Sequence, residues 1–161
     1  AKALFSKHFK NHGGNIVNIT ADNKNGMPGM GHSGAARAGV ENLTKTAAWE
    51  WGSFGVRVNA IAPGWVASSG LDTYPEDMKH AIQNLKHAVP LGRIASEAEI
   101  ASTVCFLLSK GANFITGQTL FVDGGASMGS VPALFPLQNL HQPASETWDG
   151  FHRSITPKVL R

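Results

Sequence analysis

The chain has 161 residues, of which 42% are hydrophobic and 16% are charged, so we expect a folded globular domain and exclude a disordered tail. The formal net charge is +3 and the basic residues are scattered, which argues against a nucleic-acid partner. No apolar run approaches the roughly 20 residues of a membrane span, and no signal-peptide pattern opens the chain, so we predict a cytoplasmic protein without a membrane partner. The single cysteine, Cys105, lies in an apolar run and is expected to be a small buried residue.

The first two elements in chain order are an amphipathic helix and a buried strand. Residues 1–12 place apolar side chains, among them Phe5 and Phe9, on one side of a predicted helix. Gly13–Gly14 is expected to end this helix as a C-cap. The β-branched run NIVNIT (residues 15–20) predicts a buried strand. Because the helix begins without a cap in front of it, we expect the chain to be the back part of a longer protein.

A second helix and a second strand follow. A loop of turn-forming residues (21–31) leads to a long helix, which we predict over residues 34–51 with Ser33 as its N-cap. The run VRVNAIAPG (residues 56–64) predicts another buried strand, which Pro63–Gly64 ends.

The remaining elements are two helices, one strand and a tail. The first helix is predicted over residues 75–89, and the second begins at a capping box made by Ser96 and Glu99. A short strand is expected over residues 119–122. The last part, residues 126–161, is rich in Pro, His and Gln, and we interpret it as an extended tail that wraps a surface or a partner subunit.

The alternation of helices and strands indicates an α/β fold. Strands separated by helices form a parallel sheet with helices on both faces, which is a Rossmann-type three-layer architecture. The sequence provides three such strands, within residues 1–125, so we predict a partial fold whose first strand lies at an open edge.

Three stretches carry a resemblance to a known family. They are NIVNIT, ARAGVENLTKTAAWEWGSFGVRVNAIAPGWVAS and PLGRIASEAEIASTVCFLLSKGANFITGQTLFVDGG. In their order, spacing and residue identities they resemble the C-terminal half of the short-chain dehydrogenase/reductase superfamily, most closely the trans-2-enoyl-CoA reductase and 2,4-dienoyl-CoA reductase branch. The segment DGFHRSITPKVLR (residues 149–161) is similar to the end of bacterial citronellol-type dehydrogenases.

The resemblance implies a cofactor and a partial site for it. It implies an NAD- or NADP-dependent oxidoreductase acting on a small molecule, an enoyl-CoA or an alcohol or carbonyl compound. The matched stretches correspond to the last three strands of the family's sheet. No G-x-G-x-x-G motif stands directly after a predicted strand, so the N-terminal dinucleotide half, with its phosphate loop, is expected to be absent from the sequence.

The resemblance also points to catalytic positions. The superfamily uses a Tyr and a Lys four residues later; here Ser33 stands at the Tyr position and Arg37 at the Lys position. Ser33 cannot replace a phenol as acid or base because the pKa of an aliphatic hydroxyl is far higher. The dienoyl-CoA reductases also lack this Tyr and take their acid from upstream, which makes Asp22 a candidate acid. Asp22 can equally be a turn residue.

Cofactor-binding positions follow from the same comparison. Arg37 can hold sugar hydroxyl groups, although with Glu41 and Lys45 it can equally form a charge ladder along the helix. Pro63–Gly64, Val66 and Ser68 match the family's P-G-x-x-x-T, in which the backbone near Val66 and the Ser68 hydroxyl would hold the nicotinamide carboxamide; a strand-ending turn is the alternative. We assign no metal ligands.

Two other functions remain open at this point. GHSGA (residues 31–35) resembles the G-x-S-x-G elbow of serine hydrolases, with Ser33 as nucleophile and His32 beside it. That motif needs a strand directly before the serine. Alternatively, the chain is a non-catalytic remnant that associates through its exposed sheet edge. Whatever its function, we predict that the chain forms a homo-dimer or homo-tetramer. Whether the chain is itself an enzyme is left open by the missing Tyr and phosphate loop.

Overall fold

The computed structural model describes residues 2–129 and 158–160, and these form two compact units. The first unit comprises residues 1–62 and 103–121, and the second comprises residues 63–102 and 122–161. Within the described residues, no helix combines the length and the apolar character that crossing a membrane requires. The predicted oligomer and the predicted cytoplasmic location stay predictions.

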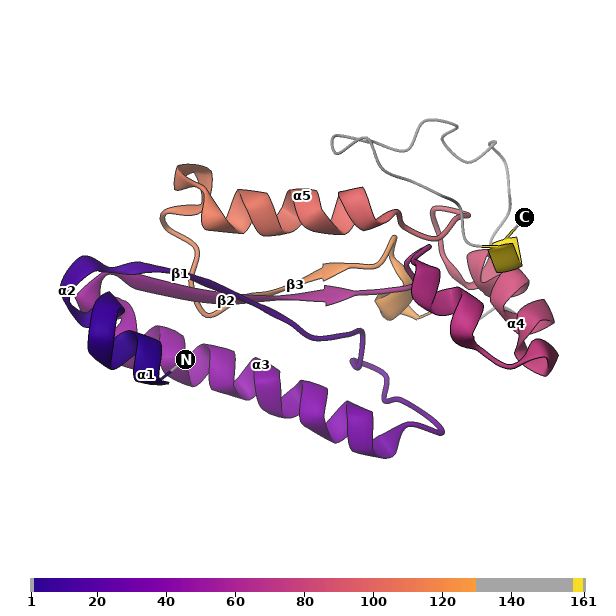
Figure 1. Ribbon diagram of the computed structural model, residues 1–161, viewed down its shortest axis with the longest axis horizontal. Helices are drawn as coiled ribbons and strands as arrows, with labels where there is room; N and C mark the ends of the chain where they lie inside the picture. Colours follow the sequence, from indigo (N-terminus) through magenta and orange to yellow (C-terminus); the bar gives the residue numbers. More distant parts are fainter. Residues whose placement is uncertain (1, 130–157, 161) are drawn as a thin grey trace. The chain divides into compact units, whose positions relative to one another are not determined.

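Three strands make one sheet in the order β1-β2-β3, and they are β1 (Gly14–Ile19), β2 (Val56–Pro63) and β3 (Thr119–Val122). β1 pairs with β2 in parallel, with Gly14 opposite Val56 and Ile19 opposite Ile61. The predicted parallel sheet is therefore confirmed, and β1 lies at its edge. In the first unit, α3 (Gly31–Trp51) covers one face of the sheet and the C-terminal half of α5 (Glu97–Leu108) covers the other (Figure 1). This arrangement confirms the partial Rossmann-type fold.

The core of the first unit lies between α3, the N-terminal helix and β2. The buried residues are Ala47, Ala48, Val56 and Val58. Phe5 packs against this core, where its ring stacks on that of Trp51 with 4.7 Å between the centroids.

The N-terminal helix is interrupted. It consists of α1 (Lys2–Leu4), a π-helical segment (Phe5–Phe9) and α2 (Lys10–His12). Gly13 ends it with φ of 66°, a left-handed conformation that favours glycine, so the predicted C-cap is confirmed.

The start of α3 differs from the prediction. The helix begins at Gly31, its N-cap is Met30, and Met30 makes no side-chain cap hydrogen bond. A turn from Met27 to Met30 leads the backbone into the helix early, so the Gly34 amide already donates to the Met30 carbonyl oxygen over 3.0 Å. Ser33 is thus the third residue of the helix, and the prediction that it is the N-cap was wrong.

The predicted helix over residues 75–89 is broken into short pieces. A 3₁₀ turn (Glu76–Met78) precedes α4 (Lys79–Asn84), and a second 3₁₀ turn (Leu85–Ala88) follows it. Within these three pieces only Ile82 is buried, so little packing energy supports a continuous helix.

α5 begins as predicted. The Ser96 amide donates to Glu99 Oε2 over 2.8 Å, and the Glu99 amide donates to Ser96 Oγ over 3.3 Å, which is a capping box. Cys105 is exposed, so the prediction of a buried thiol was wrong. The helix is apolar on more than one side, and a single sheet face cannot cover all of it.

The second unit has a small core of its own, formed by the buried residues Leu71, Ile82 and Val159. Leu71 belongs to a 3₁₀ segment (Ser69–Thr73), and Val159 to another (Lys158–Leu160). Of the predicted tail, residues 130–157 and 161 lie outside the described residues, so its extended form remains a prediction.

Candidate functional site

The carboxyl end of β1 is fastened to the first turns of α3. Thr20 is 3% exposed, and its hydroxyl donates to the Arg37 carbonyl oxygen over 3.3 Å and lies 3.5 Å from Glu41 Oε1. The Arg37 Nη1 donates to the carbonyl oxygen of Ile19, the last residue of β1, over 3.3 Å. Arg37 and Glu41 therefore contact the end of β1. The alternative from the sequence was a ladder of charged pairs along the helix surface.

Ser33 and Arg37 share one face of α3. Residues four apart lie one above the other on a helix, so Ser33 falls on the side of the helix whose next turn contacts β1. Ser33 is half-buried, whereas His32 is exposed and points from a neighbouring position around the helix. The structure thus groups Ser33 with Arg37 and does not group His32 with them.

The loop between β1 and α3 contains Asp22 and a polar residue that the motif comparison did not single out. Asp22 Oδ1 accepts a hydrogen bond from the Lys24 amide over 3.3 Å, which is the contact of a turn residue. Beside it, Asn23 Nδ2 is buried and has no hydrogen-bond partner among the described residues. A buried amide donor without a partner is costly, and it suits a site that a ligand's acceptor atom completes.

The hydrolase elbow is not formed. That motif places the nucleophile on a sharp turn directly between a strand and a helix. Here β1 ends at Ile19 and α3 begins at Gly31, so residues 20–30 separate strand and helix. Ser33 lies inside the first turn of α3 instead of at an elbow.

In the second unit, the turn after β2 is tightly fixed. The Gly64 amide donates to the Val122 carbonyl oxygen over 3.1 Å. A Cβ at Gly64 would lie 2.8 Å from the Asp123 Cα, so only glycine fits without displacement. Further along, Val66 forms an isolated parallel bridge with Ala95.

This bridge leaves backbone groups of Val66 directed away from Ala95. Its two hydrogen bonds run from the Ala67 amide to the Ala95 carbonyl (2.8 Å) and from the Ala95 amide to the Trp65 carbonyl (2.9 Å). In a parallel bridge, the residue between these two bonds turns its own N–H and C=O to the opposite side. The Val66 C=O accepts from the Ser68 amide over 2.8 Å. Within the described residues, the Val66 N–H has no such partner.

Ser68 adds a second polar group at this place. It precedes the 3₁₀ segment Ser69–Thr73 as the N-cap residue, but its side chain makes no cap hydrogen bond. The residue is half-buried. A peptide N–H and a hydroxyl separated by one residue suit a carboxamide, which accepts at its oxygen and donates at its nitrogen. The described residues therefore fit the nicotinamide end of a dinucleotide.

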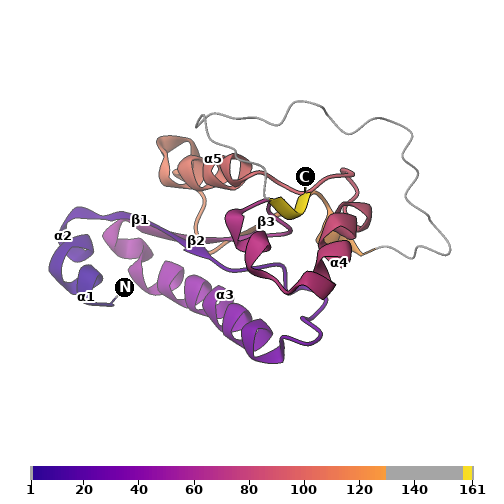
Figure 2. The ribbon, with the colours of Figure 1, turned by 45° about the vertical axis from the view of Figure 1, so that its right-hand side comes forward.

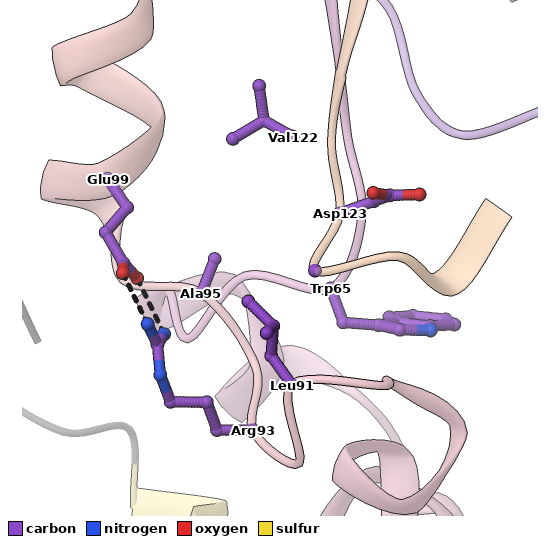
Figure 3. Close-up of a pocket in the computed structure, with 8 residues that line it drawn as sticks. Trp65, Leu91, Arg93, Ala95, Glu99, Val122 and Asp123 are labelled. Carbon is purple, nitrogen blue, oxygen red and sulfur yellow. Dashed lines mark hydrogen bonds and ion pairs between the residues drawn. The ribbon is translucent and has the colours of Figure 1, made fainter. Parts of the chain in front are cut away.

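A pocket of about 110 Å³ opens near this turn within the second unit. Figure 3 shows the Arg93–Glu99 pair on one side of it and Leu91, Trp65 and Asp123 on the other. The pocket is lined by Trp65, Leu91, Arg93, Ala95, Glu99, Val122, Asp123 and Gly124.

Arg93 and Glu99 form a bidentate ion pair, with hydrogen bonds of 2.9 Å and 2.6 Å. The hydrogen bond from Arg93 lowers the pKa of Glu99 against the opposing effect of burial, and the bond to Glu99 raises the pKa of Arg93. Both groups are therefore charged at neutral pH and neutralise one another.

Asp123 holds the turn after β3. Its carboxylate accepts from the Gly125 amide over 2.9 Å and from the Ser127 amide over 2.7 Å. Burial raises the pKa of Asp123, but the hydrogen bonds from Ser127 and Gly125 outweigh it, and the pKa lies below its ordinary value. Because the Asp123 carboxylate accepts both of these amides, we assign it a structural role in the turn after β3. Gly64 packs against the backbone of this residue.

Comparison with known proteins shows to which family the chain belongs. The family described as "Enoyl-(Acyl carrier protein) reductase" matches residues 1–127. The chain belongs to this short-chain dehydrogenase/reductase family. The resemblance seen in the sequence is thereby confirmed.

Curated members of the superfamily include dienoyl-CoA reductases. The peroxisomal 2,4-dienoyl-CoA reductase of Danio rerio is 40% identical over 133 residues, which cover 81% of this chain and 44% of that protein. The probable 2,4-dienoyl-CoA reductase of Bacillus subtilis is 41% identical over 121 residues, or 74% of this chain and 48% of that protein. The chain thus spans about half the length of these relatives.

Solved structures give the same result. A citronellol catabolism dehydrogenase (AtuB) of Pseudomonas aeruginosa PAO1 is 52% identical with a TM-score of 0.66, covering 78% of this chain and 47% of that one. A gluconate 5-dehydrogenase of Burkholderia cenocepacia, solved in complex with NADP and tartrate, is 27% identical with a TM-score of 0.68. It covers 78% of this chain and 49% of that one. NAD(P) is accordingly a cofactor used within this superfamily.

Among the residues predicted from the sequence, Ser33 and Arg37 lie on one face of α3 in the first unit. Pro63, Gly64, Val66 and Ser68 lie in the second unit, along the segment that leads from the end of β2 to the 3₁₀ segment Ser69–Thr73. The orphan donor of Asn23 and the Arg93–Glu99 pair were missed. Asn23 stands among other turn formers, so its burial has no signal in the sequence. The i,i+6 spacing of Arg93 and Glu99 matches no helical pairing rule.

Proposed function

We propose that this chain contributes the nicotinamide and substrate side of an NAD(P)(H)-dependent oxidoreductase. The substrate class is an enoyl-CoA or an alcohol or carbonyl compound. Family membership supports the reaction type. The names of the relatives, dienoyl-CoA reductases and a citronellol catabolism dehydrogenase, support the two substrate classes.

The observation that carries the proposal is the pair of polar groups at the turn after β2. The Val66 N–H is directed away from the bridge with Ala95, and the Ser68 hydroxyl makes no cap hydrogen bond. These groups would hold the carboxamide and so fix which face of the ring meets the substrate. When bound, the nicotinamide supplies or accepts the hydride.

In the first unit, Arg37 and Ser33 have different tasks. The Arg37 guanidinium has several N–H donors, and its contact with Ile19 fixes its position, so it would hold ribose hydroxyl groups by hydrogen bonds. Ser33 would orient the substrate by a hydrogen bond from its hydroxyl.

A proton must also reach the substrate when a double bond or carbonyl is reduced. Asp22 is the candidate acid on this chain, and its carboxylate accepts from the Lys24 amide. Asn23 Nδ2 offers a hydrogen bond to a ligand oxygen in the same loop.

Equilibrium binding of reduced nicotinamide mononucleotide tests the proposal, because this probe has the part of the cofactor that the described residues fit. We expect saturable binding, monitored by nicotinamide fluorescence, that Ser68→Ala weakens. Ser69→Ala, at the exposed neighbouring position, is the control and should bind like the parent. Adenosine monophosphate should not compete. Failure of the parent chain to bind the probe at millimolar concentration would refute the proposal.

A further inference from the structure

The segment from Ser69 to Ala88 has almost no core of its own. It consists of 3₁₀ turns and the six-residue α4, and its buried side chains are Leu71 and Ile82. The third buried member of this small core is Val159, which is 4% exposed and comes from the other end of the chain. Figure 2 shows the segment Lys158–Leu160 lying against α4.

The C-terminal segment is held by directed contacts as well as by burial. Both oxygens of the Asp72 carboxylate accept backbone amides, from Lys158 over 3.1 Å and from Val159 over 2.9 Å. On the other side, Gln83 Nε2 donates to the Val159 carbonyl oxygen over 3.1 Å. Amides at the start of a helical turn lack partners within the turn, so the Asp72 carboxylate caps this one from a distant part of the sequence.

The contacts continue toward the turn that holds Ser68. Val159 packs with Leu71, and the Leu71 amide donates to the Ser68 carbonyl oxygen over 3.0 Å. A chain of packing and hydrogen bonding therefore runs from the C-terminal segment to Ser68, and all of it lies within the second unit.

We propose that residues 158–160 are a strap that orders residues 69–88 and positions Ser68. Asp72, Gln83 and the small apolar core form its docking surface, and Val159 is its anchor. The ordering of residues 69–88 stands on these contacts alone. The positioning of Ser68 as a cofactor contact rests on the proposed function.

Hydrogen exchange measured by mass spectrometry on the full chain tests the strap. Val159→Thr keeps the shape and backbone of the anchor but places a hydroxyl in the apolar core, and Asp72→Asn removes the charge that receives the two amides. Both should speed exchange in residues 69–88 by about tenfold or more while β1 and α3 exchange as in the parent. Val159→Ile should keep the parent's rates.

Two control variants separate the strap from general effects of mutation. Lys158→Ala leaves the contact intact because Lys158 contributes its backbone amide and its side chain is exposed. Asp77→Asn removes an exposed acid from the same segment. Exchange rates in residues 69–88 that stay at the parent's level in Val159→Thr and Asp72→Asn, or that rise equally in the controls, would overturn the strap.

A second measurement addresses Ser68. Binding of reduced nicotinamide mononucleotide should weaken severalfold in Val159→Thr and Asp72→Asn and stay unchanged in Val159→Ile and both controls. Faster exchange with unchanged probe affinity would overturn the positioning of Ser68. A parent chain that does not bind the probe refutes the proposed function, whereas the exchange result still decides whether the strap exists.

Discussion

Arg57 on β2 and Leu107 near the end of α5 are joined by a hydrogen bond of 2.9 Å, from the guanidinium Nη1 to the carbonyl oxygen. The same guanidinium donates to the carbonyl oxygens of Ser109 (3.1 Å) and Ile115 (3.3 Å). The last carbonyls of a helix have no partners within the helix and carry its negative dipole end, so a cation there is favourable. Arg57 thus links the sheet of the first unit to the end of the helix above it.

Replacing Arg57 should destabilise the first unit. Arg57→Met keeps much of the side chain's length but leaves three carbonyl oxygens without their charged donor, and we expect a loss of about 1–3 kcal/mol in the free energy of unfolding. Urea denaturation measures this loss. Lys110→Met removes an exposed basic residue next to the same helix end and should change the stability little. Equal losses in the two variants would contradict the specific role of Arg57.

Asn59 should contribute as much as Arg57 to the stability of the first unit, because it pairs backbone groups in the interior. It is 1% exposed; its Nδ2 donates to the Ile115 carbonyl oxygen over 2.9 Å and its Oδ1 accepts from the Gln118 amide over 3.1 Å. Asn59→Leu would leave the Gln118 amide without this acceptor, and the Ile115 carbonyl oxygen would keep only the longer hydrogen bond from Arg57 Nη1 (3.3 Å). We expect a loss of about 2 kcal/mol or more in urea denaturation. Asn113→Leu, at an exposed position, serves as the control, and a loss no larger than in that variant would count against this account.

The two serines at helix starts should respond differently to alanine. Ser96 caps α5 through its bond to the Glu99 amide, so Ser96→Ala should lower the free energy of unfolding by about 1 kcal/mol. Ser33 is the third residue of α3 and not its cap, so Ser33→Ala should stay within about 0.5 kcal/mol of the parent. Urea denaturation compares them, and a larger loss for Ser33→Ala would restore the capping role.

Much of the fold could be predicted from the sequence because its signals are local. The β-branched run at β1, the capping box at Ser96 and the glycine at Gly13 each act within a few residues, and the structure confirms them. The start of α3 was misplaced because the serine looked like a cap, whereas the turn ending at Met30 had already satisfied the Gly34 amide.

The candidate site could be predicted only in part. The shared face of Ser33 and Arg37 follows from their spacing on a helix. The contacts that fix the segment after Ser68 are long-range. For example, the Asp72 carboxylate accepts a hydrogen bond from the amide of Val159, 87 residues away. The burial of Asn23 Nδ2 likewise results from how a loop packs, which no local pattern records.

Acid should weaken the second unit through Glu99. Its carboxyl pKa in the folded state is lowered from 4.5, chiefly by the hydrogen bond from Arg93. Between the folded and unfolded pKa values the unfolded chain binds more protons, so the stabilisation is present above about pH 4.5 and is lost as pH falls through the folded value. In thermal unfolding scans, Glu99→Gln should therefore flatten the fall of Tm below pH 4.5.

The control for this pH profile is Glu50→Gln, which changes an exposed carboxylate on α3. Its Tm should fall with acid as steeply as that of the parent. If Glu99→Gln keeps the parent's full slope below pH 4.5, the ion pair with Arg93 does not contribute to acid sensitivity.

Two glycine-to-alanine changes should alter the free energy of unfolding in opposite directions. At Gly39, on the exposed side of α3, no atom of the described residues lies within 4 Å of an added Cβ, so Gly39→Ala should stabilise the chain by about 0.5–1 kcal/mol through its better helix propensity. At Gly64 the added Cβ would lie 2.8 Å from both the Cα and the Cβ of Asp123. The turn or the end of β3 must then move, at a cost of about 1–3 kcal/mol.

Because the turn at Gly64 leads to Val66 and Ser68, Gly64→Ala should also weaken the binding of reduced nicotinamide mononucleotide, whereas Gly39→Ala should not. A Gly64→Ala variant as stable as the parent, and with the parent's affinity for the probe, would mean that the close approach to Asp123 does not set the geometry of the turn.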